Sequence, residues 1–181
     1  MKQLNISTGL LFGLIYGLAT VLFFIILYIL GVNSFMSSFT AIFSIGVPIA
    51  AGVWGGIYHK KSLGGYMDFS EALKTIFTIF VIGSAISTGF QYVLLNFIDV
   101  PFAQALAQAS AEKAAEMMEK FGAKQSDIDK SVEEILSGDS YSFKKQFLGF
   151  ALGTIWWFLL SLIISAILKK KKPAFENPFN Q

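Results

Sequence analysis

Residues 9–30 read GLLFGLIYGLATVLFFIILYIL, a run of 22 residues without a charged side chain. A helix needs about 20 consecutive apolar residues to cross the hydrocarbon core of a bilayer. The run follows Lys2, as the apolar region of a secretory signal peptide would. It is longer than such a region, however, and no small-residue cleavage site closes it before Gly31. We therefore predict an uncleaved first transmembrane helix.

Three further apolar runs without charge follow along the chain. They cover residues 35–58, 75–98 and 147–168. Charged residues make up only 14% of the 181 residues, whereas an average soluble domain has about 25%. Pro48 lies near the middle of the second run, and because proline removes a backbone hydrogen bond, we expect a bend there. The sequence predicts an all-α protein, with residues 1–181 forming one integral membrane domain built as a four-helix transmembrane bundle.

The long polar segment between the third and fourth runs, residues 99–146, also has helical features. Pro101 suits the first turn of a helix, and Gly122 is a typical residue just after a helix end. Apolar residues recur between them at roughly helical spacing. They are Phe102, Leu106, Ala109, Met117 and Phe121.

A second helix is predicted in the remainder of this segment. Ser126 followed by Asp129 favours a helix start, and Gly138 favours its end. Its apolar stripe would consist of Ile128, Val132, Ile135 and Leu136. The two helices together predict a helical hairpin rather than a disordered loop.

Lysines near the ends of the spans predict the orientation, because cytoplasmic loops retain positive charge. The turn 31–34 has no lysine, the loop 59–74 has three, and the run 169–172 has four. The segment 99–146 has six lysines beside nine acids, but long loops and acidic residues carry little weight in this rule. We therefore expect both termini in the cytoplasm and an extracytoplasmic hairpin.

Composition excludes several kinds of chemistry. The chain has no cysteine, so disulfides, thiol catalysis and thiolate metal sites are excluded. All 14 basic residues are lysines, which excludes bidentate recognition of phosphate or carboxylate by arginine. The net charge of +2 gives no indication of nucleic-acid binding, because the lysines lie at the predicted membrane edges. We expect no cofactor and no metal ion.

Glycines at four-residue spacing recur in three of the spans. They are Gly9, Gly13 and Gly17 in the first, Gly52 and Gly56 in the second, and Gly149 and Gly153 in the fourth. Such faces let helix backbones approach closely. One interpretation is association between copies of the chain. The commoner one, which we favour, is packing among the four helices of one chain.

Polar residues near or within the spans have modest predicted roles. In Asp68-Phe-Ser-Glu71 the acids form the pattern of a capping box at the start of the third helix. His59, the only histidine, could act in a proton relay, but the lysines beside it favour an interfacial anchor, and no acid partner is evident. Gln91 and Asn96 are expected to bond a neighbouring helix or to lie near the interface. Trp156 and Trp157, which lie well inside the fourth run, are expected in core packing or in contact with lipid.

The run Lys169, Lys170, Lys171 and Lys172 follows the fourth span directly. It could bind the headgroups of anionic lipids, at roughly 1 kcal/mol per lysine near the surface. A simple stop-transfer anchor explains the run equally well.

Residues 64–74, GGYMDFSEALK, resemble the bacterial membrane protein family catalogued as domain of unknown function 4199. The resemblance rests on a charged, glycine-bearing loop and on the Phe-Ser-Glu-Ala-x-Lys start of the third helix. A long polar segment before the last helix and a lysine-rich end also match, so that the resemblance covers nearly the whole chain. It implies four helices and a bacterial inner membrane. It transfers no activity and no functional residue.

Three classes of function remain for such a chain. The spans contain no Asp, Glu, Lys or Arg, and buried charge is the usual mark of an ion or proton pathway. We therefore predict a non-enzymatic structural or interaction subunit, with the bilayer and a protein partner or second copy as its partners. The alternative is a small transporter or channel that acts as an oligomer, with a pore lined by Ser, Thr and Gln. An intramembrane enzyme comes third, because only hydroxyl groups are available to it at membrane depth.

Overall fold

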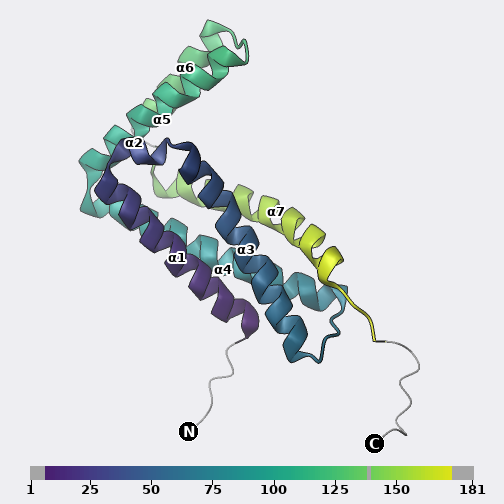
Figure 1. The fold of residues 1–181 in the computed structure, drawn as a ribbon. Helices are drawn as coiled ribbons and strands as arrows, with labels where there is room; N and C mark the ends of the chain where they lie inside the picture. The colour runs from purple at the N-terminus through teal and green to yellow at the C-terminus, as the bar shows by residue number, and fades with distance from the viewer. Residues whose placement is uncertain (1–6, 138–139, 173–181) are drawn as a thin grey trace, which may run out of the picture.

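The computed structural model describes residues 7–137 and 140–172, and in these residues the fold is all-α (Figure 1). Four helices are long and apolar enough to cross a membrane, as the sequence predicts. They are α1 (Thr8–Leu30), α3 (Ser38–Ser62), α4 (Phe69–Val93) with its π-helical continuation η1 (Leu94–Ile98), and α7 (Phe143–Leu168). The short α2 (Val32–Phe35) follows α1, and α5 (Val100–Lys120) and α6 (Gln125–Leu136) lie between η1 and α7.

The second span differs most from its predicted bounds of 35–58. The chain forms the separate turn α2 first, and the Ser37 hydroxyl then caps α3 by accepting a hydrogen bond from the Thr40 amide at 3.3 Å. A cap of this kind satisfies one of the free amides at a helix start and so fixes where the helix begins. The helix continues without interruption through Pro48, which is buried.

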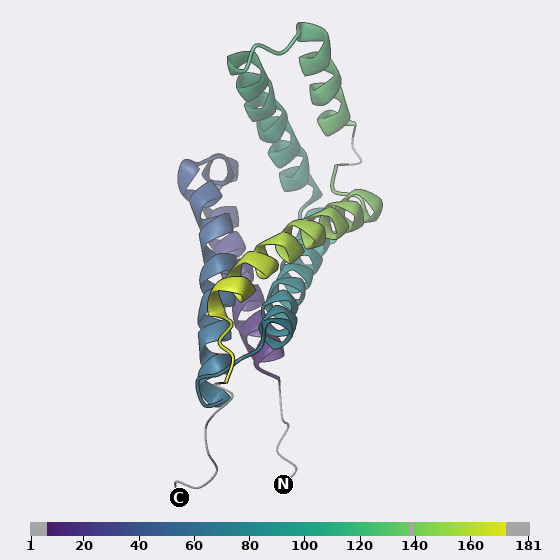
Figure 2. The same ribbon diagram turned by 90° about the vertical axis from the view of Figure 1, so that its right-hand side faces the viewer.

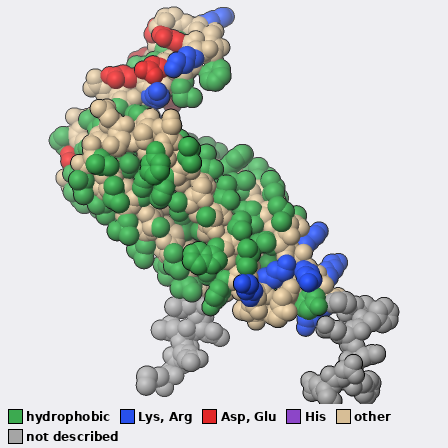
Figure 3. Space-filling model, in the orientation of Figure 1, with side chains coloured by type: hydrophobic (Ala, Val, Ile, Leu, Met, Phe, Trp, Pro, Cys, Tyr) green, Lys and Arg blue, Asp and Glu red, His purple; other side chains and the backbone are tan. Residues whose placement is uncertain are grey.

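The central helix of the bundle is α4, which contacts α1, α3 and α7. Ala72, Ile76, Ile79 and Phe80 on α4 are fully buried. The outward faces of the spans carry exposed Leu, Ile and Phe side chains, and their surface is largely apolar in Figure 3. Lipid is as apolar as these side chains, so close packing rather than exclusion of water holds such helices together.

One end of the bundle, which we call the lysine end, brings distant parts of the chain together (Figures 1 and 2). Lys60 Nζ donates to the Leu168 carbonyl at 2.8 Å, which joins α3 to α7. The backbones of Met67 and Lys170 exchange two hydrogen bonds of 2.9 Å. The start of α4 therefore lies beside the end of α7. The start of α1 lies beside the end of α3, where the Thr8 hydroxyl contacts the His59 ring. Lysine side chains gather at this end in Figure 3.

At the opposite end α5 and α6 lie side by side and project away from the spans; we call residues 100–136 the arm (Figure 2). Asp99 fixes its base: Oδ1 accepts from the Phe102 amide at 2.9 Å and caps α5, while Oδ2 accepts from the Tyr28 hydroxyl of α1 at 2.8 Å. Leu95 of η1 and Leu106 of α5 are buried against α2. The arm is thus attached to the bundle through its base.

The prediction of the apolar stripes of the arm is partly wrong. Leu106 and Ile128 are buried as expected, but Met117, Phe121 and Leu136 are exposed. The buried face of α5 is instead a stripe of alanines at four-residue spacing, Ala103, Ala107 and Ala111. Small side chains let the two helices approach closely, and the larger apolar residues toward the tip of α5 point elsewhere.

The boundaries of the arm helices correct one further prediction. The end of α5 agrees with the sequence, because Gly122 follows it with a φ of 74°, a left-handed conformation that glycine adopts without strain. The start of α6 does not agree with the sequence-based prediction. The cap residue is Lys124, which makes no side-chain capping bond, and Ser126 lies inside the helix. The expected end at Gly138 lies outside the described residues, and α6 ends at Leu136.

Candidate functional sites

Five of the seven predicted packing glycines lie at helix contacts. A Cβ atom added to Gly9, Gly13 or Gly17 of α1 would approach a side chain of α4 to 3.0, 2.8 and 2.8 Å, respectively, at Thr78, Ile82 and Ile86. On α3, a Cβ at Gly52 would meet Phe80 at 2.7 Å, and one at Gly56 would meet Leu168 at 2.6 Å. These positions leave no room for a side chain, because each added atom would require its neighbour to move.

Two further glycines at helix contacts were missed in the sequence. A Cβ at Gly55 would come within 2.5 Å of Ile79 Cδ1, and one at Gly83 would overlap the ring of Tyr16. The signal was available, because Ala51 precedes Gly55 by four residues and Ser87 follows Gly83 by four. A search for small residues in general, rather than glycines alone, finds both pairs.

Gly149 and Gly153 of α7 stand apart from the other predicted glycines. An added Cβ at either position meets no atom of the described residues within 4 Å. Both glycines line a cavity between α4 and α7. Their role in helix packing stays a prediction. It would require a helix of a second molecule to contact them.

The acid partner that seemed absent for His59 is Glu71. Nε2 of His59 lies 3.5 Å from Glu71 Oε1 on α4, and Nδ1 lies 3.1 Å from the Thr8 hydroxyl on α1. The predicted capping box is wrong, because Asp68 makes no side-chain capping bond and Glu71 turns toward the histidine instead. Since the Glu71 side chain is 47% exposed, the contact is worth at most about 1 kcal/mol. It joins three helices at the lysine end.

The predicted headgroup lysines also lie at this end. Lys169 Nζ lies 5.9 Å from the centre of the Phe69 ring, and Lys170 Nζ lies 5.3 Å from that of Tyr66. Lys170, Lys171 and Lys172 share an open pocket of about 540 Å³ with Asp68 and Glu71. These acids reduce the attraction of the pocket for an anion, and binding of lipid headgroups by the four lysines stays a prediction.

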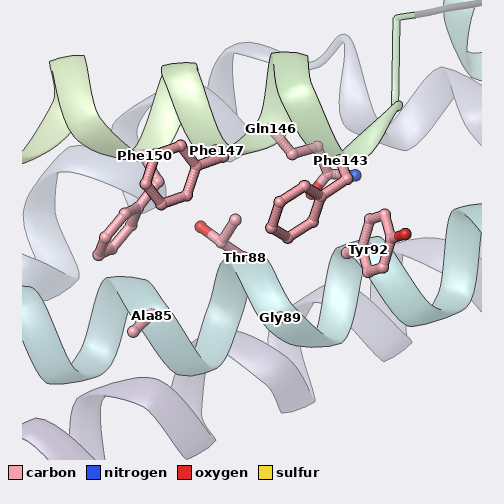
Figure 4. Close-up of a pocket in the computed structure, with 8 residues that line it drawn as sticks. All are labelled: Ala85, Thr88, Gly89, Tyr92, Phe143, Gln146, Phe147 and Phe150. Carbon is pink, nitrogen blue, oxygen red and sulfur yellow. The ribbon is translucent and has the colours of Figure 1, made fainter.

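A cleft separates α4 from the first half of α7. Its apolar part, which we call the aromatic groove, has a volume of about 190 Å³. Rings of Phe143, Phe147 and Phe150 from α7 and of Tyr92 from α4 surround it, and the Thr88 side chain rises toward α7 between them (Figure 4). Ala85, Gly89 and Gln146 complete the lining.

A second cavity of about 380 Å³, which we call the polar chamber, adjoins the aromatic groove. The two share Thr88, Gln146 and Phe150. Most of the remaining lining carries hydroxyl or amide groups or is glycine. It comprises Tyr16, Ser84, Ser87, Gln91, Ser140, Tyr141, Gly149, Gly153 and Trp157. Burial raises the pKa of the Tyr141 phenol, and a hydrogen bond with the Ser110 side chain opposes this effect; the phenol is therefore neutral at physiological pH.

The polar residues predicted within the spans take up different positions. Gln91 lines the polar chamber and bonds the Ser87 hydroxyl of its own helix at 3.2 Å. Asn96 donates at 2.9 Å to the carbonyl of Tyr141, just before α7. Trp157 packs on Phe80 with ring centres 5.1 Å apart, whereas Trp156 is exposed on the outer face. Of the two tryptophans, one therefore lies in the core and one faces outward.

The tip of the arm carries the most exposed phenylalanine of the described residues. Phe121 is 85% exposed and Met117 is 51% exposed. Met117 follows Leu106 by 11 residues, so at 3.6 residues per turn the two lie only about 20° apart around the helix. At Leu106 this stripe is buried against α2, and at the tip it is uncovered.

Within the described ranges, no three His, Asp or Glu side chains come close enough together to hold a metal ion. The carboxylates of the arm are spread over exposed helix faces, where pairs such as Lys113–Glu116 (3.2 Å) form.

Comparison with known proteins gives the family. The model of the family described as "Protein of unknown function (DUF4199)" matches residues 11–170. The chain belongs to this family. The match extends over all four spans and the arm, and so includes the loop at residues 64–74 that carries the resemblance in the sequence. No curated protein and no solved structure matches this DUF4199 member.

Membership places the aromatic groove, the polar chamber and the arm tip inside the matched region of the DUF4199 chain. The sequence indicates Gln91, Trp157 and the two glycines of the chamber separately. The chamber itself was not foreseeable, because it depends on how far α7 diverges from α4. That angle follows from side-chain packing over the whole length of both helices.

Proposed function

We propose that this DUF4199 member is a non-enzymatic interaction subunit of the bacterial inner membrane. Both of its termini lie in the cytoplasm, the arm lies outside, and the tip of the arm binds a partner protein. The observation that carries the proposal is the uncovered apolar stripe at Met117 and Phe121. Exposed apolar patches rimmed by charge are typical of protein-interaction sites.

The charge of the arm indicates the chemistry of the partner. Residues 100–136 carry seven acids and four lysines, all exposed, which gives a net charge of −3. A partner surface with an apolar pocket flanked by lysine or arginine would complement both features. An anionic membrane surface would not, because the acids would repel its headgroups. The arm also projects away from the spans (Figures 1 and 2).

Site-directed photocrosslinking tests this proposal in native membranes. A benzophenone amino acid at Phe121 should give one discrete adduct with a protein. The adduct should weaken in about 0.5 M salt, where charges beyond a few ångströms are screened, and it should be lost in Met117→Ser. The matched control is the same probe at Ala105, which is exposed on α5 nearer the base. Adducts with lipid alone at position 121, or the same products from both positions, would contradict the interaction role.

One observation favours the transporter or channel alternative. The polar chamber places hydroxyl and amide groups at membrane depth between α4 and α7, as a pore lined by neutral groups would require. Copurification from native membrane separates the two functions. A stoichiometric partner supports the interaction subunit, and a homo-oligomer with a continuous pore supports the transporter or channel.

A further inference from the structure

We propose that the polar chamber and the aromatic groove together bind a neutral amphiphile. Its uncharged, hydroxyl-bearing head occupies the chamber, and one hydrocarbon chain occupies the groove. This site is independent of the arm and of the interaction role assigned to it.

The chamber has hydrogen-bonding capacity that the protein leaves unused. The Ser84 hydroxyl lies beside the Tyr16 phenol and is closed off from the chamber, so the available groups are the amides of two glutamines. Gln91 and Gln146 each donate through Nε2, to Ser87 Oγ and to the Tyr141 carbonyl, both at 3.2 Å. The Oε1 atoms of the two glutamines take no part in these bonds and remain available as acceptors. A ligand bearing hydroxyl groups can donate to both acceptors.

The head of the ligand must be uncharged. None of the residues that line the chamber is Asp, Glu, Lys or His, so no counter-ion is available to a charged group. Placing an unpaired charge at membrane depth is expensive, whereas hydroxyl groups find neutral partners among the Ser, Thr and Gln side chains. The chamber therefore selects a polyol-like head over a carboxylate or a phosphate.

The groove provides for a chain attached to that head. It shares Thr88, Gln146 and Phe150 with the chamber, so a single molecule can occupy both cavities. The rings of Phe143 and Phe147 line the groove (Figure 4). Polar and apolar cavities joined in this way match an amphiphile better than either a free polar solute or a plain hydrocarbon.

The sizes of the two cavities suit such a molecule. The chamber, of about 380 Å³, accommodates a small polar head, and the groove, of about 190 Å³, accommodates the part of the chain nearest to that head.

Photolabelling of the intact chain in phosphatidylcholine nanodiscs tests the site. The probe is a monoacylglycerol with a diazirine in its acyl chain, and the comparison probe is the free fatty acid with the same chain. We expect saturable labelling within residues 85–92 and 143–153, displaced by unlabelled monoacylglycerol but not by glycerol. Since each neutral hydrogen bond changes affinity by roughly two- to ten-fold, the anionic probe should label these residues at least about five-fold less.

Paired variants assign the effect to the chamber. Gly149→Leu fills it and should reduce labelling at least about five-fold, because the head no longer fits. The control is Gly46→Leu on α3, where an added Cβ also meets no atom within 4 Å, and labelling should be unchanged. Gln146→Leu provides a second test: it should abolish the preference for the neutral probe while the circular dichroism spectrum remains helical.

Three results would overturn the proposal. Equal labelling of the exposed residues Phe39, Ile42 and Ile45 of α3 would show contact with bulk lipid only. Equal labelling by the fatty acid would remove the selectivity for an uncharged head. Displacement by glycerol alone would show a site for polar solutes, without a role for the groove.

Discussion

At the scale of single residues, the contact between Gly83 of α4 and Tyr16 of α1 is the closest approach in the bundle that glycine makes possible. The ring of Tyr16 occupies the space that a Cβ at Gly83 would need. Tyr16 and Gly83 are both buried, and the ring lies between helices rather than at a lipid-facing surface. The ring cannot move outward without disturbing the α1–α4 contact, which Gly13 and Gly17 also form.

Gly83→Ala should therefore destabilise the protein by about 1–3 kcal/mol, the usual cost of overpacking a close contact. The measurement is thermal unfolding in detergent, followed by circular dichroism. Gly89→Ala on the same helix is the control, because an added Cβ there meets no described atom within 4 Å, and it should leave stability unchanged or raise it by up to about 1 kcal/mol. Equal shifts in the two variants would mean that Tyr16 does not occupy this contact in the membrane.

At the scale of elements, Asp99 links α1 to α5 with one carboxylate. It caps α5 through the Phe102 amide and accepts from Tyr28 of α1, immediately after η1 ends. The arm is therefore held at its base by a cap and by one hydrogen bond, in addition to the apolar contacts with α2.

Asp99→Ala should loosen the base of the arm, because loss of an N-cap side chain costs about 0.5–2 kcal/mol. Hydrogen–deuterium exchange should become faster at residues 100–106 and remain unchanged in α4. Asp99→Asn preserves a good cap and should change exchange little, and Tyr28→Phe removes only the hydrogen bond from α1. If Asp99→Ala leaves exchange at 100–106 unchanged, the base of the arm is held by its apolar contacts alone.

The elements also show which features could be read from the sequence. The existence of each span follows from a charge-free run, and the end of α5 follows from Gly122, because both depend on local physical chemistry. The exposure of the apolar stripe at Met117 does not follow from local sequence. At Leu106 the same stripe is covered by α2, and whether it remains covered toward the tip depends on how far α5 extends beyond the bundle. Periodicity predicts that a face is apolar, but not which neighbour covers it.

The pairing of His59 with Glu71 could not be predicted for the same reason. The two residues are separated by a turn at Gly64 and Gly65, both with positive φ, that brings α4 back beside α3. Locally, Asp68 and Glu71 fit a capping box. The tertiary contact with His59 at 3.5 Å competes for the Glu71 carboxylate.

At the scale of the whole molecule, the lysines divide the structure into two unlike ends. Lys60, Lys61 and the run 169–172 lie at the lysine end, where hydrogen bonds join α3 to α7. The arm at the opposite end carries more acids than lysines. Such an asymmetry orients a membrane protein during insertion, because lysine-rich short loops are retained in the cytoplasm.

Cysteine accessibility tests this orientation directly, because the chain has no cysteine of its own. Ala123→Cys at the arm tip should react with a membrane-impermeant maleimide in intact spheroplasts, since the proposed orientation places the tip on the outer side. Lys61→Cys should react only after lysis, since the same proposal places the lysine end in the cytoplasm. Gly46→Cys, within the apolar part of α3, should react in neither condition and controls for leakage.

Reporter fusions after Lys61 and after Gln181 should both give a cytoplasmic signal. Labelling of Lys61→Cys but not of Ala123→Cys in intact spheroplasts would show the opposite orientation. The partner of the arm would then be a cytoplasmic protein.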